Sequence, residues 1–170
     1  PTDPIAWLPT LLQTNDALFP TGAYAHSFGF EELARLTDIR DESDLGRYVD
    51  DHLIPALTAF ELPYLRFAFD ETNSVVLCAL DREISACKLA RETREASVQV
   101  GRRRLAALRA MGDKPAYRDF AADIAEGAAH GNHLVVCALQ ARTEGCPLHA
   151  AMAAYFYQTI AGVCGAALKL

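Results

Sequence analysis

The ratio of unbranched helix formers to β-branched residues is the feature of this sequence that most restricts its fold. Ala and Leu together supply 51 of the 170 residues, whereas Val and Ile supply only 14. Unbranched side chains keep most of their rotamer freedom in a helix, and β-branched side chains pack well on a pleated sheet. The composition therefore predicts an all-α fold. A chain of this length is also typical of one domain with its own hydrophobic core.

Apolar spacing and turn residues divide the chain into eight or nine helices, which we expect to form one compact, bundle-like domain over residues 1–170. Apolar residues recur at helical spacing, and Pro and Gly mark the breaks. The expected helices cover about 3–13, 26–37, 43–57, 62–71, 74–87, 89–111, 115–126, 133–143 and 147–170. The segment 74–87 is apolar in nearly continuous register, which predicts a central and mostly buried helix.

The charge balance excludes one class of function and favours another. Sixteen basic residues against 22 acidic residues give a net charge of −6, which argues against nucleic-acid binding through a basic surface. The charge is unevenly distributed, because residues 1–90 carry −9 and residues 91–170 carry +3. Such polarity favours electrostatic docking to other proteins.

The cysteines and the two chain ends bear on location. Five cysteines without any Cys-x-x-Cys spacing predict neither a disulfide framework nor a zinc finger, and they are typical of buried thiols in a reducing cytoplasm. The first residues have no basic region followed by an apolar run, so no signal peptide is predicted. The missing initiator Met indicates a trimmed start, and the uncapped final helix indicates that the native chain continues beyond Leu170.

A long uncharged stretch near the end requires a separate interpretation. Residues 145–168 contain no Asp, Glu, Lys or Arg and are long enough to cross a bilayer, which leaves a membrane-anchored protein as one alternative. Ala, Gly and several polar residues dominate the stretch, so we expect a buried or interfacial helix instead. Ala161, Gly162 and Gly165 would allow another helix to approach, and Gly101 offers a similar notch. We therefore predict a homodimer through one of these faces.

Enzyme signatures are absent from the sequence. There is no Gly-x-Ser-x-Gly, no phosphate-binding Gly-x-x-x-x-Gly-Lys-Ser/Thr, no Gly-x-Gly-x-x-Gly and no His-Glu-x-x-His. We predict that the chain is not an enzyme and holds no cofactor. The alternative is a small metal-dependent or hydrolytic enzyme that uses His130, His133 and a carboxylate such as Glu126. Gly131 and Asn132 between the histidines favour a loop or a helix start, and hence a structural role for the pair.

Two further segments are candidates for partner contact. Arg102, Arg103 and Arg104 form a basic run that could reach phosphate or an acidic partner, or could simply be a solvated face. Residues 18–32 place aromatic side chains beside Pro and Gly, with polar side chains between them. These aromatic residues could plug the core, contact a partner, or do both.

Five segments along the chain together resemble one known family. They are Phe-Pro-Thr-Gly-Ala-Tyr-Ala-His-Ser-Phe-Gly-Phe-Glu-Glu at 19–32, Leu-Pro at 62–63, Arg-Glu-x-x-Glu-Ala-x-x-x-x-Gly-Arg-x-x-Leu at 91–105, Gly-Asn-His-Leu-Val-Val at 131–136, and Ala-Tyr-Phe-Tyr at 154–157. These segments resemble the urease accessory protein UreF family, in the family's order and over most of the chain.

The resemblance implies an all-α maturation factor without enzymatic activity. A UreF-like protein dimerises, joins a UreD-type (also called UreH-type) accessory protein, and with it recruits the nickel-carrying UreG-type GTPase to apo-urease. Family members continue past the equivalent of Leu170 into a further helix that engages the UreD-type partner. We expect the partner-binding residues to be Phe19, Pro20, Tyr24, His26, Ser27, Phe28, Glu31, Glu32, Arg102 and Arg103.

Overall fold

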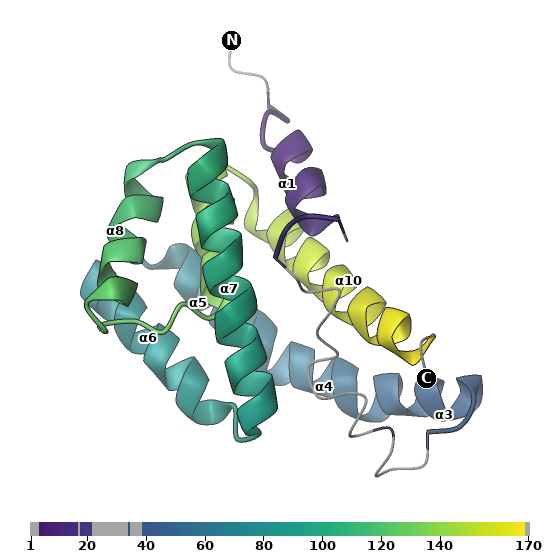
Figure 1. The fold of residues 1–170 in the computed structure, drawn as a ribbon. Helices are drawn as coiled ribbons and strands as arrows, with labels where there is room; N and C mark the ends of the chain where they lie inside the picture. The colour runs from purple at the N-terminus through teal and green to yellow at the C-terminus, as the bar shows by residue number, and fades with distance from the viewer. Residues whose placement is uncertain (1–3, 17, 22–33, 35–38, 169–170) are drawn as a thin grey trace.

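The computed structural model describes residues 4–16, 18–21, 34 and 39–168, and these residues form helices and turns without a strand (Figure 1). The predicted all-α class is therefore confirmed for the described part of the chain. Its elements are α1 (Leu8–Asn15), α3 (Glu42–Tyr48), η2 (Val49–Leu53), α4 (Ile54–Ala56), η3 (Leu57–Glu61), α5 (Leu62–Asp70), α6 (Ser74–Cys87), α7 (Arg91–Met111), α8 (Pro115–Ala125), α9 (His133–Glu144) and α10 (Leu148–Ala167). Apart from Ala34, the helix expected at 26–37 lies outside the described residues.

The segment from α3 to α5 is one uninterrupted helical rod, so the described residues form seven rods rather than eight or nine. Sequence reasoning expected a break before Pro63, and that expectation is wrong. Two π-helical turns, η2 and η3, end two residues before Pro55 and Pro63. A proline ring in a helix clashes with the carbonyl four residues earlier, and a widened turn at that position relieves the clash. The backbone therefore stays helical through both prolines.

Helix α9 is the central element of the core. Eight of its twelve residues are buried, and it packs against α5, α7, α8 and α10. By contrast α6, which the sequence suggested as central, buries five of fourteen residues and exposes Val75 and Val76. An apolar register does not distinguish a helix surrounded by neighbours from one packed along a single face.

Helix α10 packs along one side only. Its first half contacts α1, α5 and α9, and Val163 and Ala166 near its end cluster with Leu45 and Tyr48 of α3. Tyr157, on the opposite face, is exposed. This arrangement agrees with the expected buried or interfacial helix. Within the described residues, no helix combines the length and the apolarity that a membrane crossing requires.

Candidate functional site: a basic groove along α7

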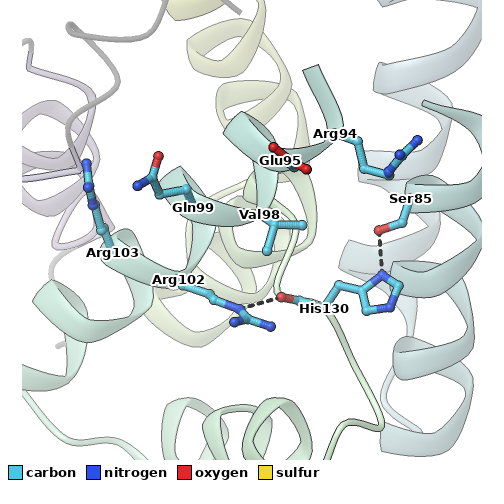
Figure 2. A pocket seen from close by; sticks show the side chains of 8 residues that line it. All are labelled: Ser85, Arg94, Glu95, Val98, Gln99, Arg102, Arg103 and His130. Atoms are coloured by element: carbon cyan, nitrogen blue, oxygen red, sulfur yellow. Dashed lines mark hydrogen bonds between the residues drawn. The ribbon is translucent and has the colours of Figure 1, made fainter. Parts of the chain in front are cut away.

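A groove runs along one face of α7, beside α6 and the loop that joins α8 to α9 (Figure 2). Its volume is about 610 Å³. Six lining residues belong to α7, one to α6 and one to the loop: Arg94, Glu95, Val98, Gln99, Arg102, Arg103, Ser85 and His130. Helical residues three and four positions apart share a face, so the α7 residues form a continuous wall.

The carboxylate of Asp81 on α6 fixes the loop that closes the groove. Its Oδ2 accepts hydrogen bonds from the backbone N–H groups of His130 (2.5 Å) and Gly131 (3.0 Å). Its Oδ1 accepts the backbone N–H of Asn132 at 2.7 Å. Asp81 is fully buried, and the N-terminus of α9 lies next to it, where backbone dipoles favour a negative charge. The loop backbone therefore has one defined position.

Gly101 of α7 lies directly beneath this loop. A Cβ at Gly101 would lie 2.6 Å from the backbone nitrogen of His133 and 2.7 Å from the carbonyl carbon of Asn132, and closer still to the carbonyl oxygen of Gly131. The predicted close approach at Gly101 is confirmed, but its neighbour is the start of α9 in the same chain. Gly101 is buried there and does not offer a face to a second copy.

Hydrogen bonds also orient the side chains at the rim of the groove. Arg102 Nε donates to the carbonyl oxygen of His130 at 2.8 Å, and His130 Nδ1 lies 2.7 Å from Ser85 Oγ (Figure 2). Arg94 Nη1 donates to the carbonyl oxygen of Lys88 at 2.8 Å. Two of the three arginines in the groove thus have a fixed side chain before any ligand binds.

The positive charge of the groove is not neutralised within the described structure. Arg94 and Arg102 bond only to backbone carbonyls, and Arg103 makes no hydrogen bond or ion pair with a described residue. Elsewhere on the same helix, Arg109 forms an ion pair with Asp113 at 3.0 Å. The groove can therefore offer guanidinium groups at several points along its length to the anionic groups of a ligand.

Comparison with known proteins identifies the family. The sequence model of the UreF family matches residues 39–170. The urease accessory protein UreF of Paenarthrobacter aurescens (strain TC1) is 35% identical over 153 residues, which are 88% of this chain and 66% of that protein. The chain belongs to the UreF family.

Other proteins that bear the same name agree with this assignment. The urease accessory protein UreF of Haemophilus influenzae (strain PittGG) is 31% identical over 166 residues, covering 96% of this chain and 71% of that protein. The corresponding protein of Actinobacillus pleuropneumoniae is 29% identical over 166 residues. The chain spans about two thirds of the length of the relatives it matches.

The structure brings together some of the residues predicted from the UreF resemblance. Arg102 and Arg103 both line the groove, and Arg102 contacts His130, which belongs to the alternative hypothesis. Phe19 is buried, with the Arg104 guanidinium 5.9 Å from its ring centre, and Pro20 is exposed. Phe19 therefore has a packing role, and its role in partner contact remains a prediction. The other predicted residues lie outside the described part of the chain: Tyr24, His26, Ser27, Phe28, Glu31 and Glu32.

The two histidines of the alternative hypothesis occupy separate environments. His130 faces the groove, whereas His133 is buried, with Nε2 3.3 Å from Cys137 Sγ and its ring centre 5.7 Å from that of Tyr155. Burial lowers the pKa of His133 to about 3, with the nearby Arg104 charge as a further cause. No group of three potential metal ligands occurs in the described structure, and Glu126 is exposed. The predicted site of His130, His133 and Glu126 is not formed.

The third arginine of the basic run points into the core instead of the groove. Arg104 is 2% exposed, and its Nε donates to Gln140 Oε1 at 2.8 Å. Its Nη1 and Nη2 donate to the carbonyl and hydroxyl oxygens of Thr14 at 2.9 and 3.0 Å. Gln140 Nε2 also donates to the Thr14 hydroxyl at 2.8 Å. This network ties α1 to α7 and α9, which positions the segment that leads into residues 19–32.

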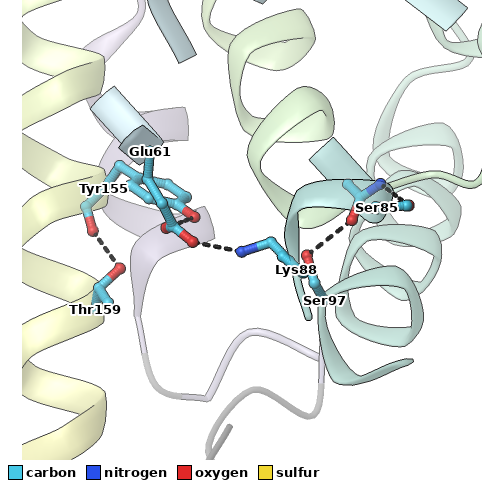
Figure 3. A network of polar contacts seen from close by, with 7 residues as sticks. Glu61, Ser85, Lys88, Ser97, Tyr155 and Thr159 are labelled. Atoms are coloured by element: carbon cyan, nitrogen blue, oxygen red, sulfur yellow. Dashed lines mark hydrogen bonds and ion pairs between the residues drawn. The ribbon is translucent and has the colours of Figure 1, made fainter. Parts of the chain in front are cut away.

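A second buried network joins the long rod to α6 and α10 (Figure 3). Glu61 forms an ion pair with Lys88 and accepts the Tyr155 hydroxyl at 2.6 Å. Burial raises the pKa of Tyr155 well above its usual value, and the Glu61 carboxylate raises it further. Tyr155 is therefore a neutral hydrogen-bond donor that holds α10 against η3.

Sequence reasoning missed the polar contacts that hold the loop beside the groove. Asp81, Ser85 and Asn132 make the main hydrogen bonds between this loop and α6, and Asn132 Nδ2 donates to Ser85 Oγ at 2.8 Å. One signal was present, because Asp81 is a charged residue within an apolar register. Buried carboxylates require partners, so its position pointed to a polar contact without naming the loop that supplies it.

Proposed function

We propose that this chain is a non-enzymatic scaffold in urease maturation, which promotes the incorporation of nickel into apo-urease. The observation that carries the proposal is its membership of a family whose curated relatives are named urease accessory proteins. In this proposal the chain acts in the cytoplasm as one domain, holds no cofactor, and binds neither nucleic acid nor membrane. Nickel and nucleotide belong to the reaction and to the partners.

The proposed partners are a UreD/UreH-type accessory protein, a UreG-type GTPase and apo-urease. Complementation tests this role: a strain that lacks the gene is supplied with the full native chain, and urease activity and urease nickel content are measured. We expect both to be restored, together with co-purification of the UreD-type and UreG-type proteins. Equal nickel content with and without the gene would refute the proposal.

A partner-contact role for residues 19–32 is part of the proposal. Its structural support is indirect, because the Arg104–Thr14 network and the buried Phe19 fix the start of this segment. The double substitution Glu31→Ala with Glu32→Ala should lower urease activation while preserving the helical circular dichroism signal. Unchanged activation and unchanged affinity for both accessory partners would remove this surface from the proposal.

Self-association through α10 is the proposed dimer mode. Ala161 and Gly162 of α10 are exposed, and Gly165 is half-buried. Tyr157, four residues before Ala161 on the same helix, is also exposed. Small residues allow close approach of a second helix, and burial of apolar area must supply most of the affinity, because exposed ion pairs contribute about 0–1 kcal/mol each. Sedimentation at about 10–50 µM should show a dimer; a Kd in this range corresponds to an association free energy of about −6 to −7 kcal/mol. Replacement of Gly162 by Glu should yield monomers, and an unaltered dimer would exclude this face.

A further inference from the structure

We propose that the groove along α7 binds an acidic segment of a partner protein, a short run of Asp and Glu side chains in extended conformation. The inference rests on the proposed scaffold function, because it assigns one of the partner contacts to this groove. Three observations carry it: the unneutralised charge of the groove, the fixed position of its walls, and its length.

The charge of the groove distinguishes it from an ordinary solvated face. Arg94, Arg102 and Arg103 have no carboxylate partner in the described structure, although acidic residues outnumber basic residues in the whole chain. Glu95, the acidic residue of the groove, lies 3.9 Å from Arg91, which lies outside the groove. Within the described residues, the carboxylates of the chain therefore leave the three arginines of this groove to carboxylates from elsewhere.

The walls of the groove are fixed before binding. The Asp81 carboxylate holds the loop backbone, and the loop carbonyl of His130 in turn holds the Arg102 side chain. Arg94 is held by the carbonyl oxygens of Lys88 and Leu89. A side chain ordered in advance loses less entropy when a ligand binds, so such a site gains affinity that a mobile surface arginine lacks.

The dimensions of the groove fit an extended peptide. Arg94 and Arg103 are nine helical positions apart, which corresponds to about 13 Å along the α7 axis. An extended chain advances about 3.3 Å per residue, so four or five residues cover this distance. Guanidinium groups match the planar carboxylate with paired hydrogen bonds. Nucleic acid is disfavoured because the net charge of the chain is −6.

Binding of a labelled acidic peptide tests the inference. The probe is a fluorescein-labelled peptide of about five Glu and Asp residues, the reference is its Gln and Asn analogue, and fluorescence anisotropy reports the affinity. The double substitution R102Q with R103Q should weaken binding at least tenfold, which corresponds to about 1.4 kcal/mol. The matched control R109Q with R118Q removes the same charge outside the groove, where both arginines pair with Asp113, and it should change the affinity less than about twofold. Salt at about 0.3 M should weaken binding to the unaltered chain.

Several results would overturn the inference. It fails if the two double variants lose equal affinity, because total charge would then explain the binding. It also fails if a labelled RNA of equal charge binds the groove more tightly, or if R102Q with R103Q changes sedimentation of the chain without changing peptide affinity, which would assign the groove to a second copy.

The test in cells separates this inference from the scaffold function. R102Q with R103Q should reduce urease activation and co-purification of one accessory partner, while R109Q with R118Q should not. If the groove variant activates urease fully and loss of the gene abolishes activation, the groove inference is refuted and the scaffold function stands. If loss of the gene leaves activation unchanged, the scaffold function itself is refuted.

Discussion

Replacement of Gly101 by Ala should destabilise the fold, although Ala is the better helix former. The new Cβ would lie 2.6 Å from the backbone nitrogen of His133 and closer still to the carbonyl oxygen of Gly131, so ordinary contact at about 3.4 Å requires a shift of at least about 0.8 Å. Such a shift would break one or two of the hydrogen bonds between the loop and Asp81. Hydrogen bonds to charged groups contribute about 1.5–3 kcal/mol each, and the gain in helix propensity offsets about 1 kcal/mol. The expected net loss is therefore about 0.5–5 kcal/mol.

Urea denaturation followed by circular dichroism at neutral pH measures this loss. Gly46→Ala is the matched control, because Gly46 lies in α3 with no atom within 4 Å of an added Cβ. The control should leave stability unchanged or raise it by up to about 1 kcal/mol. If Gly101→Ala is as stable as the unaltered chain, the loop does not have the fixed position that we assign to it.

Three further substitutions probe the buried polar groups. Asp81→Asn should cost about 2–4 kcal/mol in urea denaturation, because an amide N–H₂ would face the loop N–H donors at one of the two oxygen positions. Arg104→Met should cost about 2–4 kcal/mol by the same measurement, because Gln140 and the Thr14 carbonyl lose buried partners. The pKa of the His133 imidazole is about 3 in the folded state and about 6.5 in the unfolded state. Between these pH values only the unfolded state therefore binds a proton at this side chain. Its contribution to stability is therefore complete above pH 6.5 and falls by about 1.4 kcal/mol per pH unit toward pH 3, and His133→Gln should remove that slope between pH 7 and pH 5.

Local sequence signals predicted the helices well where the capping and turn residues agree with the tertiary packing. Asn73 and Asp41 cap the starts of α6 and α3 through their side chains, within two residues of the predicted starts. The close approach at Gly101 was predictable because a glycine inside a long helix requires a packing reason. The break predicted before Pro63 was wrong, because a proline interrupts a helix only when the preceding turn has ordinary α-helical width.

The roles of residues 101–104 could not be read from their sequence. Successive helical residues point about 100° apart, so these four neighbours cannot all face the same surroundings. Gly101 lies under the loop, Arg102 and Arg103 face the groove, and Arg104 enters the core. Which arginine becomes buried depends on Thr14 and Gln140, which are distant in sequence. Composition and spacing identify a basic run, but only the tertiary contacts decide which of its arginines is buried and which face the groove.

The buried loop contacts connect the stability of this protein to its candidate binding site. The hydrogen bonds from the loop to Asp81 hold the His130 carbonyl, and that carbonyl holds Arg102. Loosening the loop would therefore free the Arg102 side chain even while the rest of the chain stays folded, because the carbonyl that holds this side chain belongs to the loop. Conditions that cost only part of the folding free energy should already weaken acidic-peptide binding. Gly101→Ala at a temperature where the chain remains folded thus acts on the groove without removing any of its charge.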